Sequence, residues 1–163
     1  MKIQRLFQKK SRLSVGSVLF SLLLIAFMGA CSRPEEPSRV EQNKEIAVNF
    51  LTMIFNEHKV AEAFELYADP IYIQHNPYAA SGAEAAISFL GPYLEANPEA
   101  RTDIKRVIAE GDLVAIHNNP RMNATDRGRA VVDIFRLENG KVVEHWDVVQ
   151  DVPATSANEN TMF

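Results

Sequence analysis

The fold is decided by residues 129–151, which read RAVVDIFRLENGKVVEHWDVVQD. Two runs rich in β-branched and aromatic residues, 129–138 and 141–151, flank the pair Asn139-Gly140. An Asn-Gly pair between such runs strongly favours a β-hairpin, because both residues accept the positive φ angles of a tight two-residue turn. The sequence therefore predicts two long antiparallel strands near the C-terminus.

A second hairpin precedes the first one. The runs 103–110 and 112–118 have strand composition, and Glu110-Gly111-Asp112 predicts the turn between them. The residues before Arg101 have a different character, because their apolar side chains recur mainly at helical spacing. This change predicts a domain in which most of the sheet follows the helices.

The helical part begins near Glu41. Apolar spacing predicts a helix over 41–57 and a second, short helix that Asp69-Pro70 ends. Residues 71–75 have strand composition, and Ser81 with Glu84 three residues later predicts a capping box that opens a third helix. The order of the elements predicts an α+β domain shaped like a cone, with N-terminal helices packed in a strongly curved antiparallel sheet.

The main hairpin places two aspartates on one face of the sheet. Side chains alternate along a strand, so Asp133 shares a face with Phe135, and Asp147 shares a face with His145. Aspartate is disfavoured in the middle of a strand, which makes a functional use of these carboxylates the favoured interpretation. A structural network with nearby arginines or with Tyr72 is the alternative.

The opposite face of the hairpin carries an apolar patch. It consists of Val132, Ile134, Trp146 and Val148. An exposed patch of this kind indicates an interaction surface, and we expect a homodimer that pairs through this outer sheet face. Alternatively, the C-terminal tail or another protein of the cell envelope covers the patch.

The N-terminus has the layout of a cleavable signal peptide over residues 1–30. A basic start is followed by an apolar run that is too short to span a bilayer and ends in small residues. The segment Met28-Gly-Ala-Cys31 resembles a lipobox, which predicts export, lipidation of Cys31 and a membrane anchor. Ser32 favours the periplasmic side of the outer membrane. An uncleaved anchor helix is the alternative.

The residues after the signal form one domain with polar ends. We expect a tether over 31–40, a domain over 41–152 and a tail over 153–163 whose apolar tip either folds back or is disordered.

The net charge of the whole chain is −4, and the signal removes basic residues. The mature chain therefore has no basic footprint for nucleic acid. With one cysteine, it cannot form an internal disulfide.

Several motifs resemble SnoaL-like proteins, the polyketide-cyclase relatives within the nuclear transport factor 2-like superfamily. They are Tyr72-Ile-Gln-His-Asn-Pro77, Gly111-Asp-Leu-Val114 and the hairpin that ends in Glu144-His-Trp-Asp-Val148. The resemblance extends from about Glu41 to the C-terminus, and it implies the same cone-shaped fold. The superfamily includes cyclases, isomerases, dehydratases and proteins without catalytic activity, so the fold alone does not give the reaction.

The resemblance also implies roles for individual residues. Asp147 matches the aspartate that acts as acid and base in the cyclases, whereas Asp133 stands where the cyclases have a histidine. Two neighbouring carboxylates favour a state in which one holds a proton and the other acts as base. From its place near the end of the first strand, we expect His75 either to donate a hydrogen bond to the enolate oxygen or to orient the substrate. We expect the substrate, a small apolar carbonyl compound, to contact Tyr72, Phe89, Phe135 and His145.

Chemistry without a cofactor is implied by the resemblance as well. A zinc site built from His75, His117 and His145 would need three strands to converge, and no close ligand spacing supports it.

Two other functions stay open, namely a ligand-binding envelope lipoprotein without catalysis and a pure interaction module. An open pocket with paired carboxylates favours the enzyme, fully hydrogen-bonded carboxylates favour the binder, and a filled cone favours the interaction module.

Overall fold

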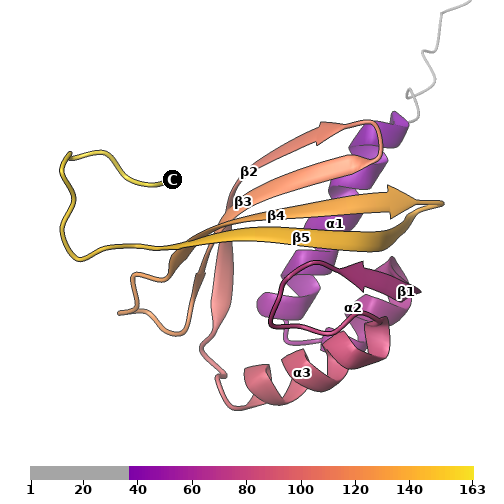
Figure 1. The fold of residues 1–163 in the computed structure, drawn as a ribbon, viewed down its shortest axis with the longest axis horizontal. Helices are drawn as coiled ribbons and strands as arrows, with labels where there is room; N and C mark the ends of the chain where they lie inside the picture. Colours follow the sequence, from indigo (N-terminus) through magenta and orange to yellow (C-terminus); the bar gives the residue numbers. More distant parts are fainter. Residues whose placement is uncertain (1–36) are drawn as a thin grey trace, which may run out of the picture. The chain divides into compact units, whose positions relative to one another are not determined.

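The computed structural model describes residues 37–163 (Figure 1). The predicted signal peptide, most of the tether and Cys31 lie outside these residues, so export and lipidation stay predictions. Within the described part of the chain, every helix is too short or too polar to cross a membrane. Residues 37–163 belong to one compact unit.

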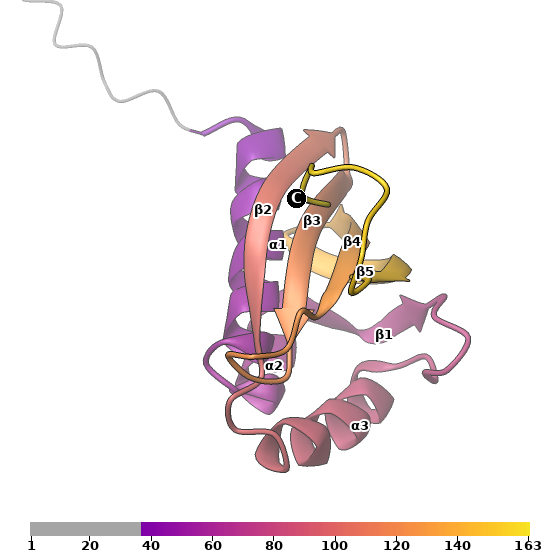
Figure 2. The same ribbon diagram turned by 90° about the vertical axis from the view of Figure 1, so that its left-hand side faces the viewer.

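Three helices and a five-stranded sheet form the domain, which confirms the α+β prediction (Figures 1 and 2). The sheet has the order β1-β5-β4-β3-β2, in which β1 pairs with β5 in parallel and the other pairs are antiparallel. The sheet is curled and does not close. Its elements are α1 (Arg39–Phe55), α2 (Val60–Tyr67), β1 (Ala68–Gln74), α3 (Ala83–Glu95), β2 (Arg101–Glu110), β3 (Leu113–Arg121), β4 (Arg129–Glu138) and β5 (Lys141–Asp151).

Strand β1 differs from the prediction at both ends. It begins directly after α2 and includes Asp69-Pro70, which the sequence analysis had placed before the strand. Proline is tolerated there because β1 is an edge strand and no ladder hydrogen bond is lost.

The capping box predicted at the start of the third helix is wrong. Helix α3 has Gly82 at its N-cap without a side-chain hydrogen bond, and the Ser81 hydroxyl instead accepts one from the backbone N–H of Gln74.

The core lies between α1, α2 and the inner face of the sheet. Helix α1 packs on β2, β3 and β5, and α2 packs on α1 and β1. Phe50 of α1 makes edge-to-face contacts with Phe64 and Phe135, at ring-centroid distances of 4.9 Å and 5.8 Å. Such aromatic pairs add stability beyond the apolar area they bury. This aromatic cluster packs α1 against α2 and against β4.

The C-terminal tail folds back over the outer face of the sheet. In Figure 2 it leaves β5 and returns to end beside β2 and β3. The Phe163 ring stacks on His117 of β3 at 5.5 Å, and Lys105 Nζ lies 5.2 Å from the centre of the same ring. The predicted patch lies on this outer face, where the exposed fraction of Val148 is 65%. The homodimer through this face stays a prediction.

Candidate active site

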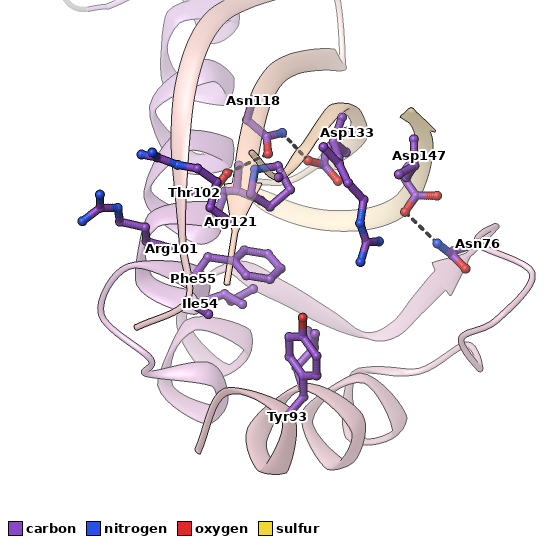
Figure 3. A pocket seen from close by; sticks show the side chains of 18 of the residues that line it. Ile54, Phe55, Asn76, Tyr93, Arg101, Thr102, Asn118, Arg121, Asp133 and Asp147 are labelled. Atoms are coloured by element: carbon purple, nitrogen blue, oxygen red, sulfur yellow. Dashed lines mark hydrogen bonds between the residues drawn. The ribbon is translucent and has the colours of Figure 1, made fainter. Parts of the chain in front are cut away.

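A cavity of about 900 Å³ opens between α3 and the inner face of the sheet (Figure 3). This volume is large enough for a drug-sized molecule. One part of its lining is mainly apolar and aromatic, here called the apolar wall, and another part is polar, here called the polar wall. Arg101, Arg121, Arg127 and Arg129 also line the cavity. The apolar wall includes Phe50, Leu51, Ile54, Phe64, Ala86, Phe89, Leu90 and Tyr93, and the polar wall includes Gln74, Asn76, Asn118, Asp133, His145 and Asp147. An interaction module with a filled cone is therefore excluded.

Asp133 is the most enclosed carboxylate of the polar wall. Its exposed fraction is 8%, and both of its oxygens have protein partners. Asn118 Nδ2 donates to Oδ2 at 2.6 Å, and His145 Nε2 lies 3.0 Å from Oδ1. Asn118 is itself held by Thr102, whose hydroxyl donates to Asn118 Oδ1 at 2.7 Å. A buried charge needs such partners, because its hydration has been lost.

Asp147 is directly opposite Asp133 in the β4–β5 register and is only half-buried. Its Oδ2 accepts a hydrogen bond of 2.7 Å from Asn76 Nδ2 (Figure 3). Asn76 Oδ1 accepts from the backbone N–H of Tyr78, which fixes the orientation of the amide. Among the hydrogen bonds of residues 37–163, Asn76 supplies the one that reaches this carboxylate. Asp147 therefore has an oxygen free to accept a proton.

Tyr72 lies beside both carboxylates in a strained conformation. Its φ angle is +30°, which is unfavourable for an aromatic residue, and the β1–β5 register is irregular at this point. Burial raises the pKa of the Tyr72 hydroxyl, and the negative charges of Asp133 and Asp147 raise it further. The hydroxyl therefore stays protonated and is available as a hydrogen-bond donor in the cavity.

The position of His75 contradicts its expected role. Tyr72, Gln74 and Asn76 line the cavity, so alternation along β1 turns His75 to the other side. There His75 Nε2 lies 2.8 Å from Glu144 Oε1, and the imidazole stacks on Trp146 at 4.6 Å. His75 thus belongs to the outer face of the sheet, and its assignment as donor to the enolate is wrong.

Gln74 and Asn76 are site residues that the sequence analysis missed. The same alternation rule that was applied to the hairpin would have found them, since both share a face with Tyr72. The other expected contact residues, Phe89, Phe135 and His145, do line the cavity. The Phe135 and His145 rings stack at 4.9 Å, which holds the imidazole flat against the wall.

The three histidines of the rejected zinc site do not converge, because His75 and His117 contact side chains outside the cavity. A different set could hold a cation. Ligand atoms of Asp133, His145 and Asp147 all lie within 4.8 Å of one another. Carboxylate oxygens with one imidazole nitrogen suit a divalent ion such as Mn²⁺ or Zn²⁺. The expectation of a site without metal stays a prediction.

Comparison with known proteins accounts for this architecture. The family model of the SnoaL-like domain matches residues 47–145. This chain belongs to the SnoaL-like domain family. The Aspergillus carbonarius protein named "Probable cyclase otaY" is 30% identical over 109 residues, which are 64% of this chain and 86% of that protein.

Solved structures of SnoaL-like and NTF2-like proteins share the fold. A SnoaL-like protein of unknown function from Burkholderia thailandensis has a TM-score of 0.58 and 18% sequence identity, covering 71% of this chain and 99% of the other. An NTF2-like protein of unknown function from Mesorhizobium loti has a TM-score of 0.57 and 25% identity, covering 72% and 97%. The curled sheet around N-terminal helices is thus the NTF2-like cone.

The family match in this SnoaL-like domain includes most of the polar wall but ends before Asp147. Tyr72, Asn76, Asp133 and His145 lie within residues 47–145, whereas Asp147 lies two residues beyond them. The role of Asp147 must therefore be argued from its contacts. Its cross-strand position opposite Asp133 and its hydrogen bond from Asn76 are the relevant observations.

Proposed function

We propose that this SnoaL-like protein catalyses acid–base chemistry of the aldol, cyclase or isomerase type on a small, largely apolar carbonyl compound. The observation that carries the proposal is the unequal bonding of the two opposed carboxylates. Both oxygens of Asp133 have hydrogen-bond partners. Within residues 37–163, Asp147 accepts one hydrogen bond, from Asn76, and it lines the open cavity. A general base needs such a free oxygen within reach of the substrate.

The aromatic part of the cavity lining supports a largely apolar, planar substrate. Aromatic side chains of α1, α2 and α3 line the same cavity as the polar wall, so a flat molecule could pack against these rings with one edge toward Asp147. The polar wall can fix the orientation of one end of an apolar body, and Arg101, Arg121, Arg127 and Arg129 also line the cavity. A carbonyl group at that end would meet Tyr72 and Asn76.

Tyr72 takes the role that the sequence analysis gave to His75. The reaction begins when Asp147 removes a proton from the carbon next to the carbonyl, and the electron pair of the broken C–H bond moves toward the carbonyl oxygen. The Tyr72 hydroxyl, kept protonated by burial and by the neighbouring carboxylates, donates a hydrogen bond to the developing enolate oxygen. Its strained backbone is consistent with a residue held in place for function.

The same carboxyl group can complete the reaction. In a ring closure, the enolate carbon attacks a second carbonyl of the same molecule, a C–C bond forms, and the resulting alkoxide takes the proton from Asp147. In an isomerisation, Asp147 returns the proton to a different carbon. Neither reaction needs another reactant, and Asp147 ends each cycle as a carboxylate. The cyclase name of the Aspergillus carbonarius relative supports the first type.

A second function is favoured by the saturated bonding of Asp133. If the polar wall is a structural network, the cavity would hold a ligand without changing it. This alternative predicts binding of apolar carbonyl compounds without any proton exchange at the carbon next to the carbonyl. Proton exchange at this carbon therefore distinguishes the enzyme from the ligand-binding protein.

The test is hydrogen–deuterium exchange at that carbon, followed by NMR in D₂O for a panel of aryl 1,3-dicarbonyl compounds. The wild type should accelerate exchange of at least one compound, and Asp147→Asn should lower the rate by about 100-fold without lowering the melting temperature. Asp112→Asn is the matched control, because this aspartate is exposed in the turn between β2 and β3 and lies outside the cavity lining. Exchange retained by Asp147→Asn, or wild-type binding without exchange, would overturn the proposal.

A further inference from the structure

The amide of Gln74 has one possible orientation. Its Oε1 accepts a hydrogen bond of 2.9 Å from the backbone N–H of Asn76. A backbone N–H can only donate, so the amide atom that faces it must be the oxygen. The same oxygen lies 3.0 Å from His145 Nδ1. Because an amide oxygen has no proton to give, Nδ1 of His145 must carry a proton and donate it.

The carboxylate on the other side of the ring is fixed by a similar argument. Asn118 Nδ2 lies 3.2 Å from the carbonyl oxygen of Ile116, which can only accept, so this atom is correctly the nitrogen. It therefore donates to Asp133 Oδ2, which must accept. The remaining oxygen, Oδ1, is the atom that faces His145 Nε2 at 3.0 Å. Any proton held by Asp133 must lie on this oxygen.

The contact between Oδ1 and Nε2 requires a proton between them. A neutral ring protonated at Nδ1 would turn the lone pair of Nε2 toward a carboxylate oxygen, and the two would repel. His145 and Asp133 are each only 8% exposed, so solvent cannot relieve the repulsion. One proton satisfies both atoms, whether the pair is written as imidazolium with carboxylate or as imidazole with carboxylic acid.

We infer that Gln74 is a positioning residue that fixes the tautomer of His145, so that His145 and Asp133 share one proton and together carry no net charge. Asp147 is then the uncompensated negative charge on this part of the polar wall. Two adjacent carboxylates would otherwise compete for a proton, and the base would be partly neutralised. The tautomer follows from the hydrogen bonds alone, whereas its importance for turnover rests on the proposed function.

The test is ¹⁵N NMR of the histidine rings at pH 7, because protonated and unprotonated ring nitrogens have well-separated shifts. In the wild type, Nδ1 of His145 should be protonated. Gln74→Met removes the acceptor, so the ring should change to the Nε2–H tautomer and Nδ1 should lose its proton. Gln74→Glu keeps an acceptor and should keep Nδ1 protonated. Gln150→Met, an exposed change on β5, is the matched control and should leave the His145 shifts unchanged.

The exchange assay then shows whether this arrangement matters. Gln74→Met should lower kcat by about 10-fold with little change in KM, and Gln74→Glu should recover most of the rate. An unprotonated Nδ1 in the wild type would overturn the inference. So would a stoichiometric metal ion whose removal by EDTA shifts the His145 signals, since a metal would then replace the shared proton. A wild type with the expected tautomer but no exchange would instead disprove the proposed function.

Discussion

Asp133 and Asp147 are directly opposite each other on β4 and β5, with their side chains on the cavity face of the sheet. Like charges in such a pair repel and destabilise the folded state. The structure compensates Asp133 through Asn118 and His145, whereas within residues 37–163 Asp147 has a single amide donor, Asn76. In the proposed function, this asymmetry separates a structural carboxylate from the one that acts as the base.

The opposed carboxylates predict that Asp147 costs stability. Asp147→Asn removes one negative charge and can keep an oxygen toward Asn76, so it should raise the free energy of unfolding by about 0.5 kcal/mol. Urea unfolding of both proteins at pH 7 measures the difference. A loss of more than about 1 kcal/mol would show that the Asp147 charge is needed for folding.

Asp133 should respond differently to isosteric and to apolar replacement. Asp133→Leu leaves the polar groups of Asn118 and His145 without a partner in a buried site, which should lower the free energy of unfolding by about 2–3 kcal/mol. Asp133→Asn can accept from Asn118 and donate to His145 Nε2, so it should cost much less. Thermal unfolding of the two variants, side by side, checks this order. Equal losses would contradict the hydrogen-bond assignment.

The role of Tyr72 can be separated from its packing. Tyr72→Phe keeps the ring against Phe50 and Phe64 but removes the hydroxyl, so exchange should slow by about 100-fold while the melting temperature stays within a few degrees. Tyr67→Phe on α2, outside the cavity lining, is the control and should keep the wild-type rate. An unchanged rate for Tyr72→Phe would assign the enolate contact to another donor.

Gly128, in the loop before β4, should be harder to replace than Gly111, in the turn between β2 and β3. Its φ angle is +69°, and an added Cβ would lie 2.6 Å from Arg121 Cγ and 2.7 Å from Asn119 Nδ2. Gly111 has a similar φ of +61° but open space around it. Gly111→Ala should therefore cost about 1 kcal/mol from backbone strain alone, and Gly128→Ala clearly more. Denaturant unfolding of both variants measures the difference, and equal costs would contradict the predicted crowding.

The outer face predicts a pH dependence of stability. Burial lowers the pKa of His117 below 6.5, and the nearby charges of Arg106 and Lys105 lower it further. Below pH 6.5 the unfolded chain therefore binds this proton more readily than the folded one. The stabilising difference is complete above pH 6.5 and is lost as the pH falls through the folded pKa.

NMR titration of His117, together with unfolding at pH 5.5 and 7.5, tests this prediction. His117→Gln should reduce the difference in stability between the two pH values. Phe163→Ala should raise the pKa of His117 toward 6.5, because the ring that covers it is lost. A His117 pKa at or above 6.5 in the wild type would disprove the prediction.

The sequence by itself determined the type of fold and most of the candidate site. The Asn139-Gly140 turn pairs Glu138 with Lys141, but the register shifts by one residue between Leu137 and Arg136, and it is this irregularity that places Asp133 opposite Asp147. Local turn chemistry and alternation are sufficient to predict the hairpin and the residues that share a face within each strand, because neighbouring strands in a hairpin need no information from distant residues. They do not specify the register shift. Phe135 and His145 were found for the same reason.

The tertiary structure alone decided how β1 meets the hairpin. This strand pairs with β5 across some 70 residues of intervening chain, and an irregular register at Tyr72 determines which of its side chains enter the cavity. No local pattern specifies that irregularity. It turned His75 outward and brought Asn76 to Asp147 and Gln74 to His145. The carboxylates are therefore a property of the sequence, and their different bonding is a property of the fold.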